Sequence, residues 1–123
     1  GECQEMKADM DKIIREEARL IILKGLACER SETLSSAMIE RLLYSYGIRR
    51  DGDFVRNELA FMEDQGAVTL KCVGSVLLAA LTERGARHLD RSFSIEGIKR
   101  PKRSSIKDEV KDAQGRAWTL NGD

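Results

Sequence analysis

Hydrophobic residues near the start of the chain recur at the spacing of one face of an α-helix. Between residues 8 and 28 they stand three or four positions apart, and charged residues fill the gaps. The stripe consists of Ile14, Ala18, Ile21, Ile22 and Leu26. This period predicts an amphipathic helix over residues 8–28 that buries one side in a core. We expect residues 1–7 to form a disordered N-terminal segment.

Two shorter helices are predicted to follow, each marked by a capping residue. Ser35 is placed to accept a hydrogen bond at the N-terminus of a helix over residues 36–46. Asp51 or Asp53 does the same for a third helix, which Gly66 ends. The expected buried sides of these helices consist of Met38, Ile39, Leu42, Leu43 and Tyr46 in one and of Val55, Leu59 and Met62 in the other.

The stretch "AVTLKCVGSVLLAALT", residues 67–82, predicts a β-hairpin. Gly74 followed by Ser75 suits a two-residue turn of type II′. In that register one face carries Val68, Leu70, Cys72, Leu77, Ala79 and Leu81. The opposite face carries Thr69, Lys71, Val73, Val76, Leu78 and Ala80. Thr82 is then placed to cap a fourth helix, "ERGARHLDRS".

The remaining residues, 93–123, divide into a basic linker and a tail. "SIEGIKRPKRSS" holds the only proline, and we expect it to be extended. "SIKDEVKDAQ" predicts a short helix, because Ser105 and Asp108 match a capping box. The apolar side of this helix consists of Ile106, Val110 and Ala113. A helix this short is marginal in water by itself, so it needs a surface to pack on.

The order of three helices, a hairpin and a fourth helix predicts one α+β domain, mainly helical, over residues 8–92. Two stretches of it resemble the winged helix-turn-helix family. "FMEDQGAVTL" is similar to the family's exit from the recognition helix into the first wing strand, and "AALTERGARHL" is similar to its exit from the wing. The resemblance covers residues 10–92 and implies a winged helix-turn-helix fold with a two-stranded wing.

Within that family, the chain resembles the small winged-helix proteins encoded by Mu-like, transposable prophages. The matching stretches are "VRNELAFMEDQGAV" and, after the wing, "GIKRP". This resemblance implies a bacterial host cell and a phage role in gene control or DNA handling. Residues beyond Lys102 lie outside it.

The composition is typical of a soluble, helix-rich protein, with 41% hydrophobic and 34% charged residues among 123. The net charge is zero, so no global field draws the chain toward polyanions. No apolar run approaches the length of a membrane span, and no signal-peptide pattern opens the chain. We therefore expect no membrane association and a cytoplasmic location in the bacterial host cell.

Cysteine and histidine are too few and too scattered for a disulfide framework or a closed zinc site. Cys3, Cys28 and Cys72 show no C-x-x-C spacing, and His88 is the only histidine. Cys28 and Cys72 are predicted to be small buried hydrophobic residues, and His88 is predicted to lie on the surface. The sequence has no Gly-rich phosphate loop and no meaningful Ser-His-Asp grouping, so we expect no metal, no cofactor and no catalytic activity.

The third helix offers side chains that can read DNA. Arg56 lies at an outward position and fits a bidentate contact to guanine, and Asn57 fits one to adenine. Arg49 and Arg50 precede the helix and are placed to contact phosphates. An ordinary solvated helix face is the alternative interpretation of Arg56 and Asn57.

The distribution of charge along the chain opposes DNA binding in one segment and favours it in another. Residues 49–64 hold three basic and five acidic residues, and we expect Asp53 and Glu58 to oppose contact with phosphates. Residues 84–103 hold seven basic and two acidic residues, and their "KRPKR" resembles a basic arm, with a solubilising tail as the alternative. The complete expected set of DNA-contacting residues is Arg49, Arg50, Arg56, Asn57, Lys71, Lys99, Arg100, Lys102 and Arg103.

The outer face of the hairpin is unusually apolar for a wing that touches DNA. Val73, Val76 and Leu78 stand there, with Lys71 as the single charge. An exposed apolar patch usually marks a contact, so we expect these three residues and Trp118 to form a protein interface. The cover is a second subunit, the tail or a partner protein.

Two functions follow from these patterns. The first is a DNA-binding winged-helix protein, a phage-encoded transcriptional regulator or DNA-handling accessory, which binds double-stranded DNA as a homodimer. The alternative is a winged-helix protein–protein interaction module that binds a phage or host protein and no DNA. A ligand- or redox-sensing repressor is a weaker third, because no metal or thiol cluster accompanies Cys28 or Cys72.

Overall fold

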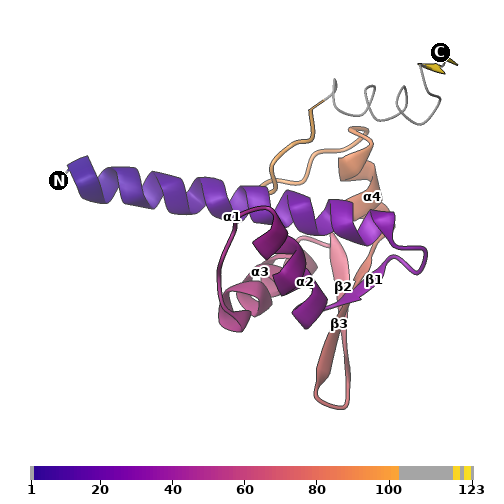
Figure 1. Cartoon of the computed structure of the whole chain (residues 1–123), viewed down its shortest axis with the longest axis horizontal. Coiled ribbons are helices and arrows are strands. Elements are labelled where there is room, and N and C mark those ends of the chain that lie inside the picture. Colours follow the sequence, from indigo (N-terminus) through magenta and orange to yellow (C-terminus); the bar gives the residue numbers. More distant parts are fainter. Residues whose placement is uncertain (1, 103–117, 120, 123) are drawn as a thin grey trace.

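The computed structural model describes residues 2–102, 118–119 and 121–122, and within them it contains four helices and a three-stranded antiparallel sheet (Figure 1). The helices are α1 (Glu2–Cys28), α2 (Ser36–Ser45), α3 (Gly52–Asp64) and α4 (Glu83–Leu89). The strands of the sheet are β1 (Thr33–Ser35), β2 (Val68–Val73) and β3 (Val76–Leu81). Near the C-terminus, a separate antiparallel pair consists of β4 (Trp118–Thr119) and β5 (Asn121–Gly122).

The first helix, α1, begins at Glu2, within the segment 1–7 that the sequence predicts to be disordered. Residues 2–8 contain no glycine, proline or β-branched residue, so extending the helix toward the N-terminus costs little. In Figure 1 this half of α1 projects beyond the other elements. Three apolar side chains on it are 67, 52 and 55% exposed, namely Met6, Met10 and Ile13.

The hydrophobic core lies between α1, α2, α3 and the sheet. Its largest fully buried apolar side chains include Ile22, Leu23, Leu26, Ile39, Leu43, Val55, Leu59, Met62 and Val68. The buried stripe predicted for the third helix is therefore confirmed. The helices α1 and α2 approach closely at Gly25, where an added Cβ would stand 2.3 Å from Leu42 Cδ2.

Fewer residues of the second helix, α2, are buried in the core than its sequence predicts. Ser35 caps it as predicted, since the Ser35 side chain accepts a hydrogen bond from the Met38 N–H at 3.2 Å. Met38 and Tyr46, both predicted to be buried, are 49 and 60% exposed. The reason is that Met38, Leu42 and Tyr46 lie along an edge of α2 that borders an open groove beside α1.

The sheet has the strand order β1–β3–β2, and its hairpin follows the predicted register. Val73 pairs with Val76, so Gly74 and Ser75 form the two-residue turn, with Gly74 in the left-handed region at a φ of +63°. The third strand, β1, is an addition to the predicted two-stranded wing. β1 pairs with β3 through Thr33 to Ser35, at the end of the connection between the first two predicted helices. Three residues are too few to carry a period of their own.

The two cysteines whose side chains are described, Cys28 and Cys72, are exposed, which corrects the prediction that they are buried. Cys28 is the last residue of α1. Cys72 has the predicted inward position in β2, but it lies far along the hairpin, where the strand extends beyond the core that covers Val68. Figure 1 shows this end of the hairpin projecting away from the helices.

The fourth helix, α4, ends in a hydrogen-bonded turn that starts the segment after it. Thr82 caps its N-terminus as predicted, accepting from the Gly85 N–H at 3.0 Å. At its C-terminal end, the Asp90 carboxylate accepts from the Ser92 N–H at 2.8 Å. Hydrogen bonds from the Ser92 side chain and backbone lower the pKa of the Asp90 carboxyl below its ordinary value.

His88 is fully buried, which corrects the prediction that it lies on the surface. Its Nδ1 accepts a hydrogen bond from the Ile95 N–H at 3.0 Å, and its Nε2 lies 2.8 Å from the Lys99 carbonyl oxygen. Because Nδ1 accepts, the ring proton is on Nε2, which donates to that carbonyl. Both ring nitrogens therefore hold the segment that follows α4.

That segment, residues 95–101, belongs to the folded domain, although the sequence predicts an extended linker from residue 93. The Ile95 and Ile98 side chains are 1 and 5% exposed, and Pro101 is also buried. Gly97 has a φ of +90°, and an added Cβ there would stand 2.6 Å from Phe61 Cζ. Only glycine suits both the backbone conformation and the close approach to α3.

Arg19 joins α1 to α3 and to the same C-terminal segment. Its Nε donates to Glu58 Oε1 at 2.6 Å, and its Nη1 donates to the Gly97 carbonyl at 2.6 Å. The guanidinium also stacks on Phe61, 3.8 Å from the ring centroid. The Glu58 side chain is only 6% exposed, which corrects the expectation that it faces outward and opposes phosphates. Glu58 lies inside because its spacing from Val55 and Met62 puts it on the buried stripe.

Replacing Glu58 by alanine should strongly destabilise the fold, because it leaves the buried Arg19 guanidinium without its carboxylate. The expected loss is about 3–5 kcal/mol in the free energy of unfolding. Urea unfolding followed by circular dichroism measures it. Asp64→Ala, which removes an exposed carboxylate from the same helix, is the matched control and should cost less than about 0.5 kcal/mol. Equal losses for the two variants would contradict a structural role for the pair.

His88→Leu should loosen residues 95–101 selectively, because it leaves the Ile95 N–H and the Lys99 carbonyl without partners. Each unpaired buried group costs about 1–3 kcal/mol. Amide hydrogen exchange provides the measurement, and the Ile95 amide should lose far more protection than the amides of α3. Arg87→Ala, on the exposed side of α4, is the control. Unchanged exchange at Ile95 would show that the histidine does not hold the segment.

Candidate nucleic-acid interface

The outward face of α3 is a continuous exposed stripe. Asp51 fixes the start of the helix, since its Oδ1 accepts from the Phe54 N–H at 3.0 Å. Helical spacing then gathers the exposed side chains on the side opposite the core, namely Asp53, Arg56, Asn57, Ala60 and Asp64. The two residues expected to read bases, Arg56 and Asn57, therefore both point to solvent.

Arg49 and Arg50 are exposed in the loop just before α3, and each rests on an aromatic ring. The Arg49 guanidinium lies 4.7 Å from the centroid of Tyr44, an exposed side chain of α2. The Arg50 guanidinium lies 5.1 Å from the centroid of Phe54 and 3.6 Å from Asp11 Oδ1 of α1. These contacts limit the positions of both cations near the N-terminal end of α3.

The carboxylates around α3 are not equivalent, although a count along the sequence treats them alike. Asp51 is used as the helix cap, Glu58 is paired inside with Arg19, and Glu63 accepts from the Leu70 N–H at 3.3 Å. Two of the five, Asp53 and Asp64, remain on the outward stripe.

Arg56 has carboxylates close to it on the surface. Its Nη1 lies 3.6 Å from Asp53 Oδ1, in a pair whose side chains are 61 and 87% exposed. Glu40 of α2 is also near, because a Cβ at Gly52 would lie 3.5 Å from Arg56 Nη1 and 3.8 Å from Glu40 Oε1. Exposed pairs of this kind are weak, so Arg56 can exchange them for another anion.

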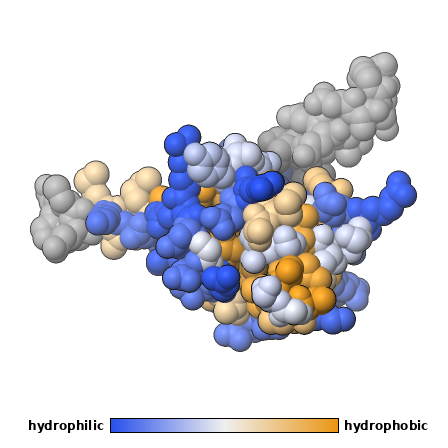
Figure 2. All heavy atoms as spheres, turned by 60° about the horizontal axis from the view of Figure 1, so that its bottom comes forward, coloured by the Kyte–Doolittle hydropathy of each residue, from blue (hydrophilic) through white to orange (hydrophobic). Residues whose placement is uncertain are grey.

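The hairpin presents an apolar tip with one cation behind it. Val73 and Val76 are 53 and 46% exposed, while Leu78 is half-buried beside Ser35 of β1. Lys71 is exposed on the same face of the sheet. Figure 2 shows hydrophobic side chains gathered over the hairpin, at the lower right of the view. Of the predicted protein interface, Trp118 lies in β4, and its side chain is outside the described residues.

The basic residues after the hairpin do not join the cluster at α3. Lys99 Nζ pairs with Glu17 Oε1 at 2.7 Å, whereas Arg50 pairs with Asp11. Glu17 follows Asp11 by six positions, which places the two carboxylates about 120° apart around α1. Arg100 and Lys102 are exposed along the same segment as Lys99, and Arg103 lies outside the described residues.

The cysteines, histidine and acidic residues of the described part of the chain form no group that could hold a metal ion. Within the described residues, no helix has the length and hydrophobicity needed to cross a membrane.

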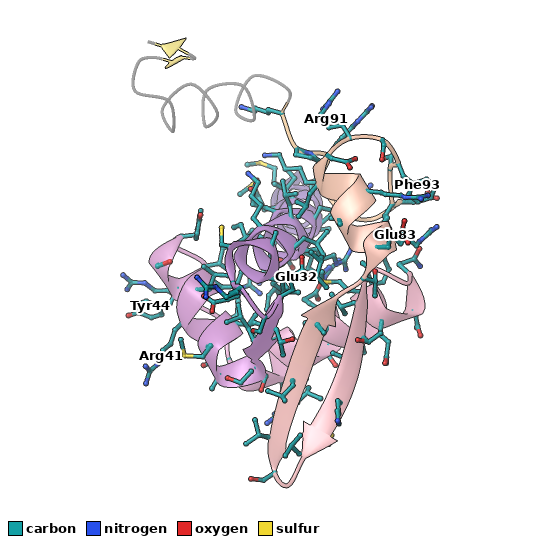
Figure 3. All side chains as sticks on the ribbon, turned by 90° about the vertical axis from the view of Figure 1, so that its right-hand side faces the viewer. Glu32, Arg41, Tyr44, Glu83, Arg91 and Phe93 are labelled. Atoms are coloured by element: carbon teal, nitrogen blue, oxygen red, sulfur yellow. The ribbon has the colours of Figure 1, made fainter. Side chains whose placement is uncertain are left out.

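Sequence reasoning missed two features that shape this surface. Glu58 lies on the buried stripe of the third helix, next to Leu59. Its position between buried residues could have predicted that it is buried. Tyr44 of α2 supports Arg49, but only the fold brings the two side chains together. Figure 3 shows Tyr44 and Arg41 projecting from the same side of α2, far from Glu83 and Phe93.

Comparison with known proteins gives one informative similarity. No protein-family model matches the chain, and no solved structure matches it significantly. The chain is similar to the uncharacterized protein gp26 of Escherichia phage Mu, with 27% identity over 93 residues. That alignment covers 76% of this chain and 96% of the phage protein. The similarity thus points to a Mu-like phage origin.

Proposed function

We propose that this chain is a winged-helix protein of a Mu-like phage that binds double-stranded DNA as a homodimer, in transcriptional regulation or DNA handling. The order helix, short strand, two helices and hairpin supports a winged-helix assignment, with α3 in the place of the recognition helix and β2–β3 as the wing. The similarity to the phage Mu protein supports the phage setting.

The observation that carries the DNA proposal is the grouping at the N-terminal end of α3. Arg49, Arg50, Arg56 and Asn57 are all exposed there, and Glu58 is turned inward against Arg19. A recognition helix contacts base edges through its N-terminal residues, so Arg56 and Asn57 are in position to read bases. Arg49 and Arg50 would contact the phosphates on either side.

The affinity of such a surface would be modest. A helix with Asp53 and Asp64 still on its outward stripe neutralises few phosphates, and Lys71 is the only cation among the described hairpin side chains. Two copies in a dimer would double the number of contacts and read two half-sites. Dimerisation is therefore part of the proposal.

The projecting half of α1 is the surface that we assign to the dimer. Met6, Met10 and Ile13 lie within one narrow sector of the helix, at 67, 52 and 55% exposure. Apolar residues spaced four and three apart form the seam of a two-helix coiled coil. A second α1 laid along this stripe would cover all three side chains.

The hairpin tip favours a second candidate function. Val73 and Val76 form an apolar edge where a DNA-contacting wing normally has cations. This edge supports a protein–protein interaction module that binds a phage or host protein without DNA. Its test is the outcome of the DNA-binding experiment below.

Binding to a labelled random duplex should fall steeply with salt if α3 contacts phosphates. We expect the affinity measured by fluorescence anisotropy to drop by at least about tenfold between roughly 50 and 200 mM salt. The double variant Arg49→Ala and Arg50→Ala should lower the salt slope by about two for each subunit bound, and so by about four for the dimer. Arg87→Ala, an exposed arginine on α4, is the matched control and should leave the slope unchanged.

No binding at the lower salt by a folded, dimeric protein would reject the DNA proposal and favour the hairpin tip as a protein-binding surface. In that case Val73→Asp should abolish capture of a purified partner, while Lys71→Asp should not.

The dimer should depend on the apolar stripe of α1. Met10→Lys together with Ile13→Lys should convert the protein to a 13.8 kDa monomer in light scattering after size exclusion, because two buried charges cannot be accommodated in the seam. Ala8→Lys lies on the other side of the helix and should leave the dimer intact. A monomeric wild type, or a dimer that tolerates the double variant, would contradict the assignment.

A further inference from the structure

A large apolar groove lies between the C-terminal half of α1 and the edge of α2. It encloses about 560 Å³ and also reaches Leu89 of α4 and Pro101. Gly25 and Leu42 both line it, and an added Cβ at Gly25 would stand 2.3 Å from Leu42 Cδ2. In Figure 3 the end of α1 faces the viewer with α2 beside it, and Arg41 extends outward from α2.

The groove is lined by large hydrophobic side chains that are exposed to solvent. Met38 of α2 and Tyr46, the C-cap of this helix, are 49 and 60% exposed, although both line the groove together with the half-buried Leu42. Exposed apolar side chains gathered around a hollow mark a binding surface. Helix-in-groove contacts use this arrangement, with anchor side chains spaced three or four apart.

The chain itself supplies a segment at the end of the groove. Pro101 is buried and lines the groove, and residues 103–123 follow it closely in the sequence. Their sequence carries an apolar stripe of helical period, Ile106, Val110 and Ala113. Ile106 is only five positions after Pro101, and an extended stretch of that length spans up to about 17 Å, which keeps the stripe within reach of the groove.

The stripe and the groove agree in length. From Ile106 to Ala113 a helix rises by about 10 Å, and from Met38 to Tyr46 the edge of α2 rises by about 12 Å. A short helix is marginal in water by itself and becomes stable when an apolar side is covered.

Charge supports the same match. Lys24 and Arg41 line the groove, and Glu29 is the single carboxylate among its lining residues. In the tail helix, Glu109 would lie directly beside the apolar stripe, on the flank opposite Lys107.

From these observations we infer that the groove between α1 and α2 is the docking site of the chain's own C-terminal segment. Residues 105–113 fold as a helix whose Ile106, Val110 and Ala113 cover Met38, Leu42 and Tyr46, with Glu109 facing Arg41. The segment thereby covers the apolar edge of α2 within the same molecule. This contact does not depend on DNA binding.

A native thiol makes the inference testable in the full chain. Cys28 is exposed and lines the groove, so with Cys3 and Cys72 changed to serine it becomes a single reporter. A new cysteine is then introduced at one tail position at a time, on the stripe as Val110→Cys or Ala113→Cys. The controls Asp108→Cys and Asp112→Cys lie on the opposite side of the same helix. Disulfide formation under mild oxidation is followed on non-reducing gels and by mass spectrometry.

We expect the faster stripe position to form an intramolecular disulfide with Cys28 at least about tenfold faster than either control, because bridging requires the two Cα atoms to lie within about 7 Å. Equal rates at all four positions would overturn the inference, because a tail that is not docked presents no preferred side. Disulfides that join two chains, at a rate that rises with protein concentration, would also overturn it and identify a second copy as the occupant.

A charge exchange tests the orientation of the segment, with the rate of the stripe disulfide as its readout. Glu109→Arg should slow formation of the stripe disulfide several-fold, because it places two cations together. Adding Arg41→Glu should restore the rate. Neither substitution touches the buried core, so both proteins should keep the circular dichroism spectrum of the parent. If the double variant stays as slow as the single one, Glu109 does not face Arg41 and the proposed orientation is wrong.

Discussion

The arrangement of the other elements depends on the contacts that the Arg19 guanidinium makes. It is nearly buried, and a charge in that environment is tolerated only with a carboxylate and further acceptors around it. Glu58 and the Gly97 carbonyl supply these from two other segments, which fixes α3 and residues 95–101 against α1. With Glu58 drawn inside, the neighbouring Arg56 and Asn57 must face solvent. The internal ion pair thus decides which side of α3 is offered to other molecules.

Local patterns predicted most of the elements, because helix periodicity and caps such as Ser35 and Thr82 act within a few residues. The features that were missed depend on partners far away in the sequence. β1 exists only through its pairing with β3, and His88 is buried only because residues 95–101 fold back over α4. A short polar stretch and a histidine among charges carry no local sign of such contacts.

The sequence predicted part of the candidate interface, because the residues of that part are also close together along the chain. Arg49, Arg50, Arg56 and Asn57 stand close in sequence, so a helix and its preceding loop are enough to gather them. Whether Lys99 joins them depends on the path of the chain around α1, which no local rule gives. A count of charges along residues 49–64 also misled, because it treats a buried Glu58 and an exposed Asp64 as equivalent.

The bond from Arg19 to Gly97 also has a consequence for biosynthesis. It spans 78 positions, and the Glu17–Lys99 pair spans 82, so these two contacts of α1 can form only when almost the whole domain has been translated. Glu58 is translated earlier, 39 positions after Arg19, so the ion pair can form before the hydrogen bond to Gly97. Contacts of such long range slow folding. The last contacts of α1 therefore form only after residues 97–99 have left the ribosomal exit tunnel.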